Sequence, residues 1–194
     1  MARLSLRNLA VTIIFQSESP RMNRPNLSFM MQHPAHWVAL GLGSGLSPKA
    51  PGTVGTLWAW AVYAWLITPW LSHLGVTGMG VLLVMSFLLG WWACTVTARH
   101  MGLTDSSHMV WDEVVAFWAL LWLASATTWP DQLALFVLFR LFDSVKVGPV
   151  AWADQAFKGL DARGGWGVMF DDLVAAALAA LTWWAGIELW HGLF

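Results

Sequence analysis

The sequence predicts an all-α fold, a multi-pass membrane helical bundle of about four to five apolar helices with polar loops on the cytoplasmic face. Hydrophobic residues make up 58% of the 194 residues and charged residues only 11%, whereas a soluble domain usually carries about 25% charged residues. No Asp, Glu, Lys or Arg occurs between residues 50 and 98. Sixteen tryptophans are present, and indole rings favour the membrane–water interface. The alternative for any one of them is an ordinary core position.

Five apolar stretches are the candidate helices, and they cover residues 54–71, 77–98, 114–129, 131–147 and 173–190. At about 1.5 Å per residue, each of the first two reaches roughly 27 Å or more, which is enough to cross the hydrocarbon. A short uncharged link, 72–76, joins these two, and Pro130 is expected to stop the third. The fourth carries charge near its end, so a dip into the interface is an alternative to a full crossing. A polar, glycine-rich segment, 148–172, precedes the last stretch.

Basic residues indicate the orientation in the membrane. Residues 1–33 are expected to form a basic, disordered tail, and residues 34–194 the membrane domain. Lys and Arg flank the apolar stretches on one side, whereas the opposite connections, near Ser72 and Pro130, carry none. The basic side is expected to be cytoplasmic. The net charge of −1 predicts no nucleic-acid partner, and a single cysteine, Cys94, excludes an intrachain disulfide.

The first of four polar clusters is GLGSGLSPKAPGTVGT, residues 41–56, directly before an apolar stretch. Glycines let backbone N–H groups approach an anion, and the N-terminus of a helix adds a positive dipole end. Lys49 adds a point charge that suits phosphate. A tight interfacial turn with small residues for helix packing is the alternative interpretation.

Two acidic pairs stand where apolar helices are expected to begin. They are Asp112-Glu113 and, after the glycine-rich run GGWG, Asp171-Asp172. Adjacent carboxylates can hold a hard cation through oxygen. The alternative is helix capping, in which an N-cap aspartate is followed by an acid that suits the helix dipole.

The remaining cluster is Arg140-Leu-Phe-Asp143-Ser-Val-Lys146. Spacings of three and six residues keep its charges on one side of a helix, where a ladder of salt bridges is the alternative to a functional role. A charge at membrane depth costs about 2.5–3.5 kcal/mol on insertion scales and tends to face a polar cavity. His100 and His108 are candidate acid–base groups, although ordinary surface positions explain them as well.

Taken together, the clusters predict phosphate chemistry at one membrane face. Carboxylates that bind Mg²⁺, accompanied by Arg and Lys, are the usual equipment for it. The five expected carboxylates are Asp112, Glu113, Asp143, Asp171 and Asp172, and the expected bases are Lys49, Arg140 and Lys146.

Four runs in order, GLGSGLSPKAPGTVGTL, VWDEVVAFW, FRLFDSVK and GGWGVMFDD, resemble the motifs of the bacterial phosphatidylglycerophosphatase A family over roughly residues 36–190. The resemblance implies Mg²⁺-dependent hydrolysis of the terminal phosphate of phosphatidylglycerophosphate to give phosphatidylglycerol, in phospholipid biosynthesis at the bacterial inner membrane. Two positions depart from the family pattern. Lys146 is followed by Val147-Gly148-Pro149 instead of Pro-x-Pro, and Arg163 stands where the family often has His.

The expected roles follow from the clusters and the resemblance. Mg²⁺ is assigned to Asp112, Glu113, Asp171 and Asp172, and catalysis to Asp143, Arg140 and Lys146. The phosphate-bearing lipid headgroup is assigned to Lys49, Gly43, Ser44, Gly52, Thr53 and Gly165. Two alternatives remain: a small ion channel or transporter, for which charges spread through several spans are expected, and a phosphatase for another lipid phosphate. The oligomeric state is not indicated.

Overall fold

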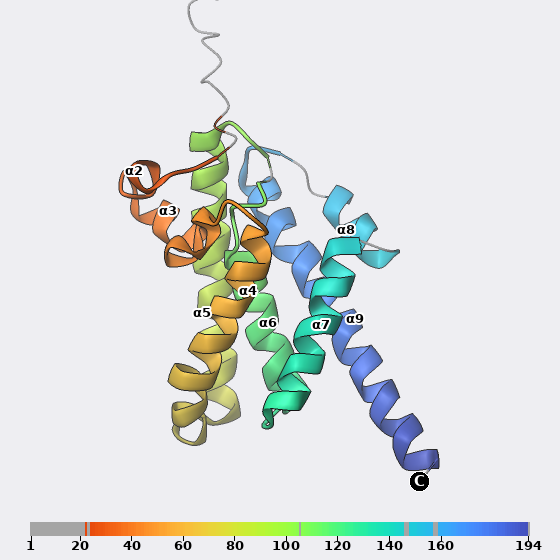
Figure 1. Ribbon diagram of the computed structural model, residues 1–194. Coiled ribbons are helices and arrows are strands. Elements are labelled where there is room, and N and C mark those ends of the chain that lie inside the picture. The colour runs from red at the N-terminus through yellow and green to blue at the C-terminus, as the bar shows by residue number, and fades with distance from the viewer. Residues whose placement is uncertain (1–21, 23, 105, 146–147, 157–158, 194) are drawn as a thin grey trace, which may run out of the picture.

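The computed structural model describes residues 22, 24–104, 106–145, 148–156 and 159–193, and all regular elements within these residues are helical. They are α2 (Leu27–Met30), α3 (Pro34–Ala39), the 3₁₀ segment η1 (Gly41–Leu46), α4 (Pro51–Val62), the π-helical turn η2 (Tyr63–Ile67), α5 (Thr68–Met101), α6 (Trp111–Leu123), α7 (Trp129–Val145), α8 (Pro149–Ala156) and α9 (Ala162–Leu193). The all-helical prediction is confirmed for these residues. In Figure 1 the longer helices form a bundle, and α2, α3 and α8 lie at one end of it.

Helix α6 forms the centre of the bundle and packs against α4, α5, α7 and α9. Its sequence is apolar on all sides after the first turn, which is typical of a helix surrounded by other helices. Val114, Phe117 and Leu121 have no exposed surface. Phe117 contacts Phe139 of α7 with ring centroids 5.8 Å apart. The first turn of α6 therefore directly precedes a fully buried, packed stretch of the same helix.

The first two apolar stretches form a hairpin, as their sequence predicts. The chain runs through α4 and η2 into α5, and the helical backbone breaks at Gly75, where φ is +61° and ψ is −173°. Glycine adopts this conformation at little cost. The break falls inside the predicted link, residues 72–76, and the second arm is the long helix Gly75–Met101.

The predicted boundary between the third and fourth stretches is wrong. Helix α6 ends at Leu123, and α7 begins at Trp129 with Pro130 in its first turn. Proline is favoured at this position because its missing N–H would have no partner inside the helix. Thr128 supports the new start by donating its hydroxyl to Asp131 Oδ2 at 2.6 Å. Pro130 therefore begins a helix instead of stopping one.

The polar, glycine-rich segment 148–172 contains α8 and the first turns of α9, so α9 begins well before the predicted start of the last apolar stretch at residue 173. A Cβ atom at Gly165 would collide with Thr95 Oγ1 of α5, and one at Gly164 would collide with the backbone oxygen of Gly159. The glycines therefore allow α9 to pack closely against its neighbours. As a consequence, Asp171 and Asp172 lie well inside a helix.

Part of the predicted tail, residues 1–33, has structure. Helix α2 begins after the N-cap Asn26, whose side chain accepts from the Phe29 N–H at 2.9 Å. Phe29 and Met30 are buried and form a cluster with Leu40 and Met101. Residues 1–21 and 23 lie outside the described residues, so the prediction of a disordered tail stays a prediction for them.

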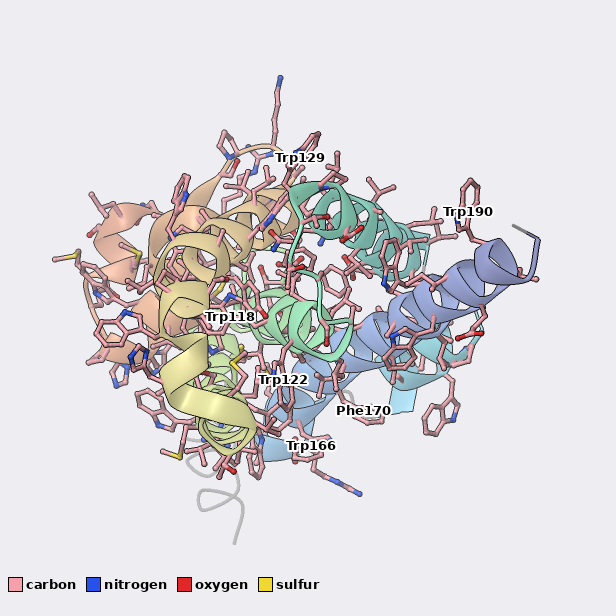
Figure 2. All side chains as sticks on the ribbon, turned by 90° about the horizontal axis from the view of Figure 1, so that it is seen from below. Trp118, Trp122, Trp129, Trp166, Phe170 and Trp190 are labelled. Carbon is pink, nitrogen blue, oxygen red and sulfur yellow. The ribbon has the colours of Figure 1, made fainter. Side chains whose placement is uncertain are left out.

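Two helices in the described part of the chain are long and apolar enough to cross a membrane, Gly75–Met101 and Ala162–Trp190, with mean hydropathies of 1.9 and 1.5. Their most apolar windows are only 28% and 22% buried, whereas the core helix of a soluble protein is mostly buried. Tryptophans occur both in the core and at exposed helix ends. Trp118 lies in the interior, whereas Trp129 and Trp190 lie at the periphery (Figure 2) and are 70% and 64% exposed.

Candidate active site

A polar cavity of about 300 Å³ lies among the ends of α4, α6 and α7 nearest to α2, α3 and α8, beside an interior stretch of α9. The ionisable side chains on its lining, among the described residues, are five carboxylates and one guanidinium. They are Asp112, Glu113, Arg140, Asp143, Asp171 and Asp172. Three separate stretches of the chain thus bring their predicted charged residues to one place.

The first acidic pair lies in the first turn of α6, where both side chains are buried. The N-cap is Val110, and no side chain caps the helix by a hydrogen bond. Asp112 Oδ1 instead accepts from the N–H of Glu113 at 2.9 Å. The interpretation of Asp112 as an N-cap residue is therefore wrong. Glu113 Oε2 is buried and has no hydrogen-bond partner.

The second acidic pair projects from the interior of α9, which begins at Ala162. Asp171 and Asp172 are 7% and 4% exposed. Capping cannot explain them, because the backbone N–H groups at this depth bond within the helix. Asp172 Oδ2 is buried without a hydrogen-bond partner. An unpaired buried carboxylate oxygen is costly, and its presence in a native protein calls for a ligand or a solvent partner.

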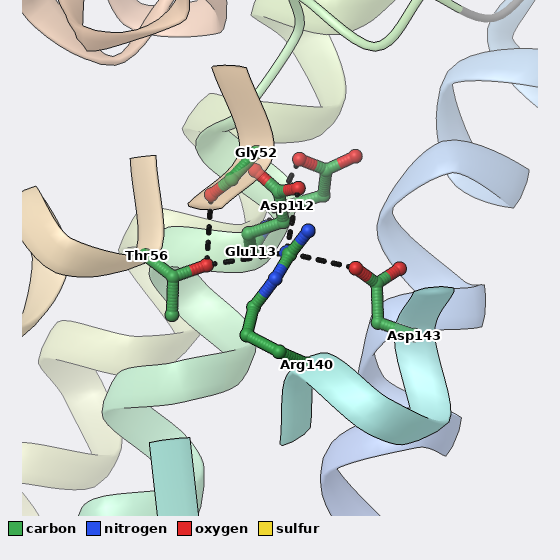
Figure 3. A network of polar contacts seen from close by, with 6 residues as sticks. All are labelled: Gly52, Thr56, Asp112, Glu113, Arg140 and Asp143. Atoms are coloured by element: carbon green, nitrogen blue, oxygen red, sulfur yellow. Dashed lines mark hydrogen bonds and ion pairs between the residues drawn. The ribbon is translucent and has the colours of Figure 1, made fainter. Parts of the chain in front are cut away.

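Arg140 of α7 contacts side chains of α4 and α6 beside the cavity. Its Nη1 atom lies 2.8 Å from Asp143 Oδ2 and 3.1 Å from Glu113 Oε1. Nη1 also donates to Thr56 Oγ1 of α4 at 3.3 Å (Figure 3). The predicted salt bridge between Arg140 and Asp143 is present, and Lys146, the third member of that cluster, lies outside the described residues.

The cavity has an excess of negative charge among its described residues, with five carboxylates against one guanidinium. Buried like charges repel strongly unless a cation offsets them. Carboxylate oxygens are the ligands that Mg²⁺ prefers, so the chemistry of the donors, with two buried oxygens unpartnered, fits a hard divalent cation. As the described side chains are placed, no group of three or more His, Cys, Asp or Glu is gathered closely enough to hold a metal ion. Binding would therefore require these side chains to turn toward one another.

Gly52 is the one predicted headgroup residue on the lining. A Cβ atom there would collide with Glu113 Oε1 and would lie 3.1 Å from Arg140 Nη2. Only glycine lets the first turn of α4 approach these two side chains so closely.

The other predicted headgroup residues lie away from the cavity lining; they are Gly43, Ser44, Lys49, Thr53 and Gly165. Gly43 has a φ of +105° in the η1 turn, and the Ser44 hydroxyl donates to the carbonyl of Gly41 in the same turn. Lys49 is exposed. Within the run 41–56, residues 41–46 form the η1 turn and residues 51–56 begin α4. Only Ala50, Pro51 and Gly52 of this run line the cavity.

Neither candidate acid–base histidine lines the cavity. His108 is buried, and its Nδ1 lies 2.7 Å from the carbonyl oxygen of Gly45. His100 pairs with His36, as discussed below. Four hydroxyl residues were not predicted from the sequence: Ser106, Ser107 and Ser144 on the lining, and Thr56 beside Arg140. Thr56 was accessible to prediction, since it follows Gly52 by one helical turn within the first motif.

An all-helical chain with apolar helices of membrane length and a carboxylate-lined polar cavity at one bundle end belongs to the class of helical membrane-type proteins with a buried acidic site. The family model of phosphatidylglycerophosphatase A matches residues 37–187. The chain therefore belongs to the phosphatidylglycerophosphatase A family.

Curated relatives agree with the family. Phosphatidylglycerophosphatase A of Haemophilus influenzae is 36% identical over 168 residues, which cover 87% of this chain and 97% of the relative. The protein of the same name from Escherichia coli is 37% identical over 150 residues, 77% of this chain and 81% of the relative. A putative phosphatidylinositol-3-phosphatase of Bacteroides thetaiotaomicron is 35% identical over 140 residues, 71% of this chain and 84% of the relative. No solved structure matches the chain.

Proposed function

We propose that the protein removes the terminal phosphate of phosphatidylglycerophosphate and releases phosphatidylglycerol and inorganic phosphate, with Mg²⁺ as its cofactor. The observation that carries the proposal is the cavity, in which five buried carboxylates and one arginine meet in a chain of this family. The names of the two relatives that match most of the chain support the substrate. The unpartnered oxygens of Glu113 and Asp172 support the cation.

The proposed roles of the residues rest on the chemistry of the side chains that line the cavity. Asp112, Glu113, Asp171 and Asp172 would hold Mg²⁺, which supplies a Lewis acid for the phosphoryl group and lowers the pKa of a bound water. The Arg140 guanidinium neutralises phosphoryl oxygens as negative charge moves to the leaving group. Asp143 keeps the guanidinium on the cavity side through its 2.8 Å ion pair. Lys146, three residues after Asp143 in the sequence, adds a second positive charge in this proposal.

The proposal places the protein in the bacterial inner membrane as a multi-pass bundle, with residues 34–194 as the membrane domain and residues 1–33 as a cytoplasmic tail. The two candidate spans lie in α5 and α9, and the α4–η2 arm, α6 and α7 would complete four to five crossings. The basic residues near the cavity end support a cytoplasmic site. The acyl chains would remain in the bilayer while the headgroup enters the cavity.

A second lipid phosphate is an alternative substrate, because one relative is named a putative phosphatidylinositol-3-phosphatase. A channel or transporter is less well supported. The charged residues that the structure describes around the cavity gather at one end of the bundle instead of following a path through it.

The test is phosphate release by the purified protein in detergent from three lipids: phosphatidylglycerophosphate, phosphatidic acid and phosphatidylinositol 3-phosphate. We expect preference for the first, inhibition by EDTA and recovery with Mg²⁺. A preference for another lipid would replace the proposed substrate, and full activity in EDTA would refute the metal. Ion flux in liposomes without phosphate release would favour a channel.

A further inference from the structure

Thr56 is a fully buried residue of α4 beside the cavity. Its hydroxyl donates to the carbonyl oxygen of Gly52 at 2.9 Å and accepts from Arg140 Nη1 at 3.3 Å (Figure 3). A carbonyl oxygen can only accept, so the single hydroxyl proton is committed to Gly52 and a lone pair faces the guanidinium. We propose that Thr56 is a positioning residue that holds Arg140 in the orientation needed at the phosphoryl group, an inference that rests on the proposed function.

Arg140 needs such a contact because the other oxygens around Nη1 are carboxylates. Glu113 Oε1 and Asp143 Oδ2 lie 3.1 Å and 2.8 Å from this atom, and they attract the guanidinium toward themselves. Arg140 Nε is buried and has no hydrogen-bond partner, so that edge of the guanidinium is not fixed by the protein. The Thr56 hydroxyl is the neutral contact that fixes Nη1 from the side of α4.

The local sequence of α4 supports this role. Gly52, Gly55, Thr56 and Ala59 form its buried face. The absence of a side chain at Gly52 brings the helix close to Arg140, and Thr56 stands one turn later on the same face. Thr56 is the polar member of this small-residue face. Its methyl group fills volume, whereas its hydroxyl is what meets the guanidinium.

A pair of substitutions separates these two contributions. Thr56→Val keeps the shape and removes the hydroxyl, whereas Thr56→Ser keeps the hydroxyl and removes the methyl group. If the hydroxyl orients Arg140 for charge that develops during the reaction, Thr56→Val lowers kcat about tenfold and leaves KM within about twofold, since the lost interaction matters mainly in the transition state. Thr56→Ser should retain activity within about twofold of the unsubstituted protein.

The experiment measures kcat and KM with phosphatidylglycerophosphate in mixed micelles, and thermal unfolding reports the fold of each variant. A double-mutant cycle with Arg140→Lys adds a second readout. Because Thr56 acts through the guanidinium, Thr56→Val should lower kcat by less than about twofold in the Arg140→Lys background.

Three results overturn the inference: a Thr56→Val variant with normal kcat, a Thr56→Ser variant as slow as Thr56→Val, or a full Thr56→Val effect in the Arg140→Lys background. Failure of the proposed function gives a different result, because the unsubstituted protein would then release no phosphate from phosphatidylglycerophosphate. In that case the double-mutant cycle is measured with whichever lipid phosphate the protein hydrolyses, and the same three results overturn the inference. If the protein hydrolyses none of them, both proposals are refuted.

Discussion

Two polar clusters, each with at least one buried member, differ in how completely their buried polar atoms are paired. One is the carboxylate cavity of α6, α7 and α9. The other, the histidine cluster, consists of His33, His36 and His100 and joins α3 to α5. His36 is 1% exposed, its Nδ1 lies 2.8 Å from the carbonyl of Phe29, and its Nε2 lies 2.8 Å from His100 Nδ1. His33 Nδ1 accepts from the N–H of Ala35 as an N-cap.

The two clusters differ in whether their buried polar atoms have hydrogen-bond partners. The Phe29 carbonyl can only accept, so His36 carries its proton on Nδ1, and Nε2 accepts from His100. Both ring nitrogens of His36 are therefore used by the fold. In the carboxylate cavity, Glu113 Oε2 and Asp172 Oδ2 have no partner. Cavity size does not distinguish the clusters, because a cavity of about 470 Å³ also adjoins the histidines. Unpaired buried atoms are the better indication of a binding site.

The largest expected effect follows from removing one charge in the cavity. Asp171→Asn or Asp112→Asn should lower kcat at least about a hundredfold, because a metal ligand or its charge is lost. The melting temperature should stay equal or rise, since buried like charges are reduced. Phosphate release and thermal unfolding measure both quantities.

Glu188→Gln is the matched control for these variants. Glu188 is exposed and lies near the C-terminus of α9, far from the cavity that Asp171 lines. Activity should be unchanged in this variant. Normal activity in Asp171→Asn and Asp112→Asn would show that the carboxylate cavity, like the histidine cluster, serves only the fold.

A smaller effect is expected from Mg²⁺ on stability. A ligand at about 100 times its Kd stabilises the native state by about 2.7 kcal/mol. Addition of Mg²⁺ should therefore raise the melting temperature of the unsubstituted protein, and Asp172→Asn should reduce this shift. An equal Mg²⁺ shift in Asp172→Asn would show that the ion binds elsewhere. Because this readout needs no substrate, it tests the cation independently of the reaction.

The smallest expected effect concerns pH and the histidine cluster. Burial lowers the pKa of His36 from its ordinary value of 6.5, the neighbouring His100 and His33 lower it further, and the bond to the Phe29 carbonyl opposes them. The exposed Arg99 adds positive charge to the same cavity. When α2 and α3 detach, His36 becomes exposed and binds a proton more readily than it does when buried. The packing of α2 and α3 is therefore expected to be stable above pH 6.5 and to weaken as the pH falls below that value.

Hydrogen–deuterium exchange of the α2 and α3 amides at about pH 7.5 and about pH 5.5, corrected for intrinsic rates, measures this weakening. His36→Leu should abolish the pH dependence and leave kcat within about twofold. A large loss of kcat in His36→Leu would mean that the histidine cluster takes part in the chemistry.

The sequence identified the charged residues of the cavity but misjudged several helix boundaries. Charge is rare in this chain, so Asp112, Arg140 and Asp171 stood out against an apolar background. Proline and glycine each fit two local structures, so the sequence alone did not decide between them. Pro130 suits the start of a helix as well as a stop. Gly165 suits close packing as well as a loop, and only its neighbour on another helix, Thr95, decides between them.

The unbroken course of α9 has a consequence for how the protein meets its lipid. Asp172 and Trp190 lie 18 positions apart on one continuous helix, which corresponds to about 27 Å at about 1.5 Å per residue. If Trp190 is anchored at the far interface, the length of α9 fixes the depth of the Asp172 carboxylate in the bilayer. Bilayer thickness would then govern access to the headgroup, and a thicker membrane would draw the carboxylates of the cavity below the plane of the lipid phosphates.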